Sequence, residues 1–322
     1  MRRTSSACAS NPRDKIYDLL GLATARDQTE FNIRYGDEIP QVFADFTKHI
    51  IQTKATFDIF VDQWSPATGQ EQVAILSWVQ DFSRPPRTTP LSMTKVHSFS
   101  ASSETLPNDP GHEPSTLTVR LIRLDTVEHI LRDCVAEIEN GDHIDSFRLL
   151  SLPIMQTFLA NTANHPMSDI DPRKKLKRTG ELWRTLILDQ GSSSVLLASE
   201  IYREIFEAIG TSIDGNGIQD IAELGHSLGS KFNADEEYVR LVVRTFEHRI
   251  LFTTRDGFIG VAPESVQKGD HVVIAHGAST PVVLRASTTP GTFSLVGDCY
   301  FKGAMYGEAM RCGLEEEVVT LV

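Results

Sequence analysis

The stretch from Arg249 to Glu308 constrains the fold more than any other part of the chain. Short runs rich in Ile, Val, Phe and Thr alternate there with turn sequences such as Arg-Asp-Gly, Lys-Gly-Asp and Pro-Gly-Thr. Turns that recur about every eight to twelve residues are typical of consecutive antiparallel strands. The pattern predicts a small antiparallel β-barrel or meander over residues 249–322.

Much of the chain before this stretch shows helical spacing instead. From Ile39 to Ile51 the apolar side chains are spaced by three and four residues, which predicts an amphipathic helix with one broad buried face. The segment from Leu117 to Ile138 is ambiguous, because it begins either as a strand or as a helix that continues to its end. Further helices are predicted over residues 146–162, 180–189, 195–209 and 233–246.

These patterns together define an expected fold class and domain organisation. We expect an α+β fold in which residues 1–248 form a mostly α-helical body. Residues near 83–115 are rich in Ser, Thr and Pro and are expected to form a disordered or exposed loop. The small β-rich subdomain of residues 249–322 is expected to pack on the helical body.

Charge and cysteine usage narrow the classes of partner and location. The chain carries 31 basic and 43 acidic residues, a net charge of −12, which disfavours nucleic acid and anionic lipid as partners. The one basic run, residues 173–178, is most simply a solvated loop. Four cysteines without paired spacing, no apolar leader and no apolar run of about 20 residues predict a soluble, cytoplasmic protein without a membrane span.

The common signatures of phosphate, dinucleotide, metal and acyl-transfer chemistry are missing from the sequence. We therefore predict neither a metal nor a cofactor. Three clusters of aromatic and charged residues remain as candidates, namely Trp78 with Asp81, Trp183 with Arg184 and Asp189, and Tyr300 with Tyr306 and Glu308. A structural interpretation makes them core aromatics and structural ion pairs. A functional interpretation places them around a cleft between helices and barrel, where an Arg or Tyr donor could polarise a carbonyl.

The functional interpretation assigns a role to each candidate residue. The predicted catalytic residues are Arg184, Tyr300 and Asp81, and the predicted substrate-binding residues are Trp78, Trp183 and Tyr306.

Five sequence segments, taken in order, resemble the downstream half of fungal heterokaryon-incompatibility (HET) proteins. They are Asn11–Leu22, Ile75–Phe82, Leu182–Ile187, Leu251–Gly260 and Tyr306–Met310. The resemblance spans nearly the whole chain and implies a filamentous fungus as the source. Members of the family usually carry, upstream of these segments, a HET domain similar to TIR domains that is credited with the cell-death signal. We expect this chain to lack that region, so the resemblance does not carry the death-effector activity over to it.

Two hypotheses of function follow. The first is a cofactor-independent cyclase or isomerase, for example of the Diels–Alder type, acting on a hydrophobic small molecule in fungal secondary metabolism. Such catalysis needs only a shaped apolar pocket and one or two hydrogen-bond donors. The alternative is a non-catalytic regulatory or recognition module that binds a protein partner. A deep apolar pocket lined by Trp183 or Tyr300 would favour the enzyme, and a flat exposed patch would favour the module.

Overall fold

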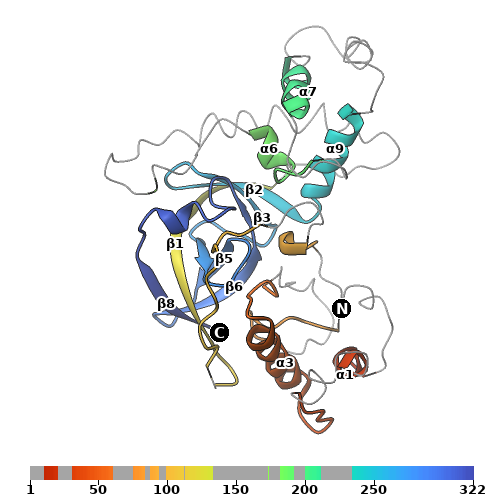
Figure 1. Ribbon diagram of the computed structural model, residues 1–322, viewed down its shortest axis with the longest axis vertical. Coiled ribbons are helices and arrows are strands. Elements are labelled where there is room, and N and C mark those ends of the chain that lie inside the picture. Colours follow the sequence, from red (N-terminus) through yellow and green to blue (C-terminus); the bar gives the residue numbers. More distant parts are fainter. Residues whose placement is uncertain are drawn as a thin grey trace.

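An eight-stranded sheet dominates the computed structural model (Figure 1), which describes residues 11–20, 31–60, 75–83, 88–93, 99–111, 113–132, 173, 182–191, 200–211 and 234–322. The strands are β1 (Leu117–Leu131), β2 (Arg249–Thr254), β3 (Ile259–Pro263), β4 (His271–Ala275), β5 (Val282–Ala286), β6 (Thr292–Asp298), β7 (Tyr300–Phe301) and β8 (Glu316–Leu321). The α-helices are α1 (Asp14–Leu20), α3 (Ile39–Lys54), α6 (Leu182–Leu186), α7 (Glu200–Thr211) and α9 (Ala234–Thr245), and short 3-10 helices cover Leu91–Met93 and Ala309–Arg311.

Five of the strands close into a barrel. Strand β1 pairs with β4 on one side and with β8 on the other, and β4, β5, β6 and β8 complete the ring through neighbouring pairs. All of these pairs are antiparallel except β6 with β8, which is parallel. Strands β2, β3 and β7 extend the sheet from the far half of β1. The pairing of β6 with β8 covers only two residue pairs, and we call this junction the barrel seam.

Strand β1 is fifteen residues long and belongs to both parts of the sheet. Its first half pairs with β8 and β4, and its second half, from Val127, pairs with β2. The register shifts at two places along it, between Arg123 and Asp125 against β4 and between Val127 and His129 against β2. Irregularities of this kind bend a strand and redirect its side chains. Asp125 therefore lies where β1 passes from one partner to the next.

The predicted fold class is wrong. The structure is mostly β rather than a helical body with a small barrel, because the sheet recruits β1 from residues 117–131, inside the predicted body. The sheet is also mixed, not antiparallel. Among the described residues the longest helix, α3, has 16 residues, and none is long and apolar enough to cross a membrane. The boundary predicted between residues 248 and 249 stays a prediction, although β1 joins the sheet from its N-terminal side.

Several local predictions can be compared with the structure directly. The helix predicted from Ile39 to Ile51 is confirmed as α3. The ambiguous segment from Leu117 begins as a strand. The helix predicted over residues 146–162 lies outside the described residues. Within the predicted loop 83–115, Phe99, Ala101 and Ser102 are buried.

The helices lie at two ends of the sheet (Figure 1). At one end, α3 packs its buried face, which includes Phe43 and Ile51, into the cluster that also holds the barrel residues Val273 and Leu295. At the other end, α6, α7 and α9 contribute Trp183, Tyr202 and Tyr238 to a cluster with residues of β2 and β3. A third cluster lies largely among the strands themselves. The buried apolar surface of these clusters is the main source of stability.

The segment that carries Ser77 fills one half of the barrel seam. The Ser77 hydroxyl accepts a hydrogen bond from the backbone N–H of Leu295 in β6 at 2.9 Å and donates one to the terminal carbonyl of Val322, just after β8. Leu295 is 4% exposed. The hydroxyl thus joins two strands at the point where their own pairing stops.

Replacing Ser77 with Ala should lower the free energy of unfolding by about 1–3 kcal/mol, because it leaves the buried N–H of Leu295 without an acceptor. Chemical denaturation of the two proteins measures the difference. Ser77→Thr keeps the hydroxyl and should lose much less. Equal losses for the Ala and Thr variants would show that the hydroxyl does not hold the seam.

Candidate functional site

The charged centre of the candidate site is Arg184, on the short helix α6. Its guanidinium donates to the carboxylate of Asp189 at 2.8 Å and to that of Glu200 at 3.1 Å. The same group lies over the ring of Trp183, 4.5 Å from the ring centroid. Arg184 is therefore held by two carboxylates and one aromatic face.

The backbone after α6 turns sharply and brings Asp189 to Arg184. Leu188 and Asp189 have φ values of 54° and 56°, and the N–H of Asp189 donates to the carbonyl of Arg184 at 2.7 Å. Two consecutive left-handed residues that are not glycine cost conformational energy, and such residues are frequent at functional or constrained positions. The surrounding packing compensates, since Leu186, Ile187 and Leu188 are all buried.

Tyr306 joins this cluster from the C-terminal part of the chain. Its hydroxyl oxygen lies 3.5 Å from a carboxylate oxygen of Asp189, a long contact for a hydrogen bond. Burial raises the pKa of the Tyr306 phenol, and the charges of Asp189 and Glu308 act in the same direction. Tyr306 is therefore a neutral donor beside a carboxylate rather than a phenolate.

Tyr300 packs in the same apolar cluster as Trp183, and Phe99 lies against both tyrosine rings, with centroids 6.3 Å from Tyr300 and 5.7 Å from Tyr306. Tyr300 is 1% exposed and Trp183 3% exposed. The structure thus gathers four of the six predicted site residues, namely Trp183, Arg184, Tyr300 and Tyr306. Their roles in catalysis and substrate binding stay predictions.

The other two predicted residues, Trp78 and Asp81, lie elsewhere. Trp78 belongs to the cluster under α3, and its ring faces the ammonium of Lys48 at 5.4 Å. Asp81 accepts hydrogen bonds from the backbone N–H and the hydroxyl of Ser83, at 2.9 and 2.5 Å, which closes a local turn. Neither belongs to the cluster around Arg184.

Two hollows formed by the described residues have other linings. One, of about 30 Å³, has room for about one water and is lined by residues of α9, β2 and the segments near Leu91 and Gln190. Another, of about 230 Å³, lies between α1 and α3 and is lined by residues such as Tyr17 and His49. Neither is lined by Trp183, Arg184, Tyr300 or Tyr306.

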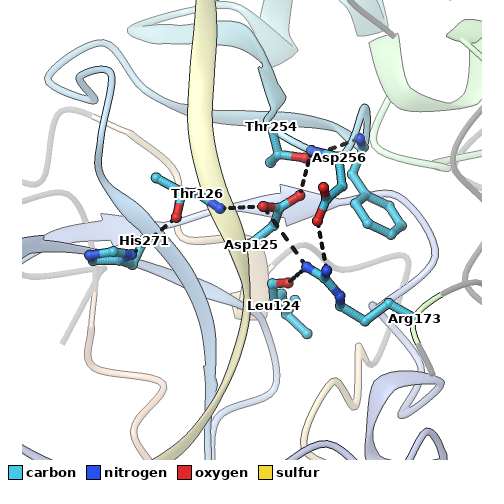
Figure 2. Close-up of polar contacts among 8 residues, drawn as sticks. Leu124, Asp125, Thr126, Arg173, Thr254, Asp256 and His271 are labelled. Carbon is cyan, nitrogen blue, oxygen red and sulfur yellow. Dashed lines mark hydrogen bonds and ion pairs between the residues drawn. The ribbon is translucent and has the colours of Figure 1, made fainter. Parts of the chain in front are cut away.

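A second polar cluster was not predicted from the sequence. Figure 2 shows Arg173 beside Asp125 and Asp256 at the bend of β1. The guanidinium of Arg173 lies 2.6 Å from the carboxylate of Asp256 and 3.9 Å from that of Asp125, and it donates to the carbonyl of Leu124 at 2.6 Å. Arg173 opens the basic run that was predicted to be a solvated loop, yet its side chain is only 20% exposed. No local pattern links these residues, because they come from three distant parts of the chain.

Asp125 itself is tied to the backbone around the bend. Its carboxylate accepts hydrogen bonds from the N–H of Thr126 at 2.7 Å and from the N–H of Asp256 at 3.1 Å, and the hydroxyl of Thr254 also bonds to it (Figure 2). Burial raises the pKa of the Asp125 carboxyl, with a further increase from the charge of Asp256, and the hydrogen bonds oppose this shift. Asp125 therefore holds the backbone at the bend of β1, although burial disfavours the charged form of its carboxylate.

The stability of the protein should depend on pH through Asp125. Because folding raises the pKa of this carboxyl, the folded state binds the proton more tightly, and the contribution to stability is lost as the pH rises through the folded pKa. The free energy of unfolding, measured by denaturation at a series of pH values, should rise on acidification relative to that of Asp125→Asn. A difference between the two proteins that stays flat, or that changes in the opposite direction, would contradict this assignment.

The barrel identifies the class of protein. Residues 206–319, which include the strands from β2 to most of β8, match the family model of the Het-6 beta-barrel domain. This match confirms the resemblance to heterokaryon-incompatibility proteins that the five sequence segments predicted, and a curated relative supports it. Strand β1 lies outside the matched residues although it completes the barrel.

A curated relative extends the similarity over most of the chain. The chain is 25% identical to heterokaryon incompatibility protein 6, OR allele, of Neurospora crassa, over 94% of this chain and 49% of the relative. The chain thus spans about half the length of this relative. No solved structure matches the chain.

Proposed function

We propose that this chain is a recognition module of a heterokaryon-incompatibility system, which binds a protein partner through the outside of its β-barrel. The match of residues 206–319 to the Het-6 beta-barrel domain supports this, as does the similarity to a relative named for heterokaryon incompatibility. The chain corresponds to about half of that relative.

The main support for the proposal is that the candidate catalytic groups contact one another. Arg184 is bound by the carboxylates of Asp189 and Glu200 and by the ring of Trp183. Tyr300 and Trp183 are almost fully buried in the core. Groups that pack and pair with one another in the core stabilise a fold, whereas groups that act on a substrate line an open cavity. The packing of this cluster therefore favours a protein that binds through its surface over an enzyme with an active-site cavity.

An exchange experiment in Neurospora crassa tests the proposal. The half of heterokaryon incompatibility protein 6 that aligns with this chain is replaced by the chain, and heterokaryon formation is scored against strains with the original protein. We expect the exchange to change which strains are compatible. Gly36→Ala is the control, because Gly36 is exposed and has open space around the added methyl group. The exchanged protein with this substitution should give the same compatibility pattern as the exchanged protein without it. Unchanged compatibility in every pairing, with the protein present at normal abundance, would contradict the proposal.

A second candidate function is the cofactor-independent cyclase or isomerase acting on a hydrophobic small molecule. One observation favours it, namely that Trp183 and Arg184 lie in one cluster with Tyr300 and Tyr306, which are more than a hundred residues away in sequence. Incubation of the purified chain with a hydrophobic extract of fungal metabolites, followed by mass spectrometry, would reveal isomers or cyclised products. Turnover that is lost in Arg184→Ala and Tyr300→Phe, while the fold survives, would establish the enzyme. The absence of any change in the extract would reject it for these metabolites.

A further inference from the structure

The second half of the barrel seam leaves part of β8 without a neighbouring strand. Strand β6 pairs with β8 at only two positions, Thr292 with Thr320 and Phe293 with Leu321. The two strands are parallel, and β6 begins where β8 ends. The residues of β8 before Thr320 therefore have β1 on one side and no strand of the described residues on the other.

The hydrogen-bond directions show which backbone groups face this open side. In β1, the N–H groups of Thr118 and Arg120 donate away from β8, to Pro110 and Asn108. The residues of β1 between and beside these two therefore form the backbone hydrogen bonds with β8. In β8, the N–H of Thr320 donates across the seam to Gly291. Because a strand alternates its sides, the N–H and C=O groups of Glu316 and Val318 point to the seam as well.

These four groups are available to an incoming chain. No backbone hydrogen bond joins Glu316 or Val318 to the described residues on the seam side. The Val318 residue is 66% exposed and the Glu316 side chain 48% exposed. Figure 1 shows β8 at the left margin of the barrel. An open strand edge of this kind can pair with an extended peptide.

The charge at this edge defines the partner. Residues 315–317 are three consecutive glutamates, and the whole chain carries a net charge of −12. Arg123 pairs with Glu317 at 2.8 Å, and Arg120 contacts Glu316 at 3.9 Å, so the glutamate run is only partly neutralised within the described residues. A second copy of this chain would place like charges opposite each other, which is destabilising. A basic strand would place opposite charges there.

We propose that the edge of β8 from Glu315 to Val318 binds an extended, basic segment of a protein partner by adding it to the sheet as a further strand. The inference rests on the proposed recognition function and names the surface and the chemistry of the partner. The open edge would hold about four residues, or about 13 Å of extended chain. The backbone would provide affinity, and the glutamates would select Lys and Arg at alternate positions.

A synthetic octapeptide, Lys-Val-Lys-Thr-Lys-Val-Lys-Thr, serves as the probe for the full chain. We expect calorimetry to detect binding, and hydrogen exchange at the amides of Glu316 and Val318 to slow by roughly tenfold or more at saturation. The same peptide N-methylated at alternate residues keeps its charge but loses donors, and it should bind roughly tenfold more weakly or worse. Equal binding of both peptides would show attraction by charge alone and would overturn strand addition.

A matched set of variants locates the site on the protein. Val318→Pro removes an N–H that points to the seam and not to β1, so the barrel should remain folded while affinity falls by roughly tenfold or more. Val318→Ala removes the side chain but keeps the N–H and should bind nearly normally. Glu315→Lys combined with Glu316→Lys should also weaken binding by roughly tenfold. Unchanged affinity in Val318→Pro would overturn the assignment.

Two further outcomes are informative. If the glutamates only protect the edge from association, Glu315→Lys with Glu316→Lys will form dimers or aggregates and the wild type will not bind the peptide, which overturns the inference. The inference can fail separately from the proposed function. If the exchange experiment leaves compatibility unchanged while the chain still binds the peptide, only the proposed recognition function is rejected. Compatibility changes that persist in Val318→Pro would reject only the role of β8.

Discussion

Replacing Asp298 with Ala should lower the free energy of unfolding by about 3–5 kcal/mol, because it leaves the guanidinium of Arg249 buried without its counter-charge. The two side chains are each 3% exposed, and they lie 2.6 Å apart. Asp298 also accepts the backbone N–H of Leu91 at 2.6 Å, while Arg249 donates to the carbonyl of Thr89 at 3.2 Å. The pair therefore ties β2, β6 and the segment at residues 88–93 together, and removing one member disrupts all three.

Urea denaturation of Asp298→Ala and the wild type provides the measurement. The combined replacement of Arg249 with Met and Asp298 with Leu should recover much of the loss, because apolar residues of similar size need no charge compensation. Glu207→Gln is the control, since the pair of Glu207 with Arg203 is exposed and spans 4.0 Å, and it should change stability by less than about 1 kcal/mol. A loss below about 1 kcal/mol in Asp298→Ala would mean that the pair is not required for the fold.

The sequence allowed α3 to be predicted because its pattern is local. The three-and-four spacing of Val42, Phe43 and Phe46 exists before any tertiary contact forms, and the same residues are buried in the structure. Strand β1 could not be assigned in this way. Its buried residues include Leu121, Ile122 and Leu124 almost in succession, because partners cover both faces near the bend. The pattern of the segment therefore fits a strand and a helix equally well, and its strand partners lie more than a hundred residues away in sequence.

In the candidate site too, contacts between residues close in sequence could be predicted, and contacts between distant residues could not. Arg184 and Asp189 were predicted as one group since they are close in sequence, and they form a pair at 2.8 Å. Tyr306 reached the same cluster only through the path of the barrel, which no local pattern specifies. The grouping of Trp78 and Asp81 with Arg184 was a guess about tertiary structure, and the fold separates them. The cluster of Asp125, Arg173 and Asp256 combines three segments and had no signal in the sequence.

The position of Trp78 leads to the second large effect. We expect Trp78→Ala to lower the free energy of unfolding by about 3–5 kcal/mol, since the residue is 1% exposed and its loss would leave a large cavity under α3. The ring also lies below the ammonium of Lys48, which donates to the carbonyls of Gly111 and Glu113 at 3.2 and 2.5 Å. Without the ring, this anchor of the segment before β1 would lose a contact that holds it in place.

Trp78→Phe is the control that separates packing from binding. It keeps one six-membered aromatic ring and removes the rest of the indole, including the N–H, which has no hydrogen-bond partner among the described residues. The Phe variant should therefore lose less than half as much stability as the Ala variant in the same urea titrations. A residue that bound a substrate would show the reverse, with little change in stability and a lost ligand contact. If Trp78→Ala loses less than about 1 kcal/mol, the structural role given to Trp78 is wrong and the substrate-binding role predicted from the sequence regains support.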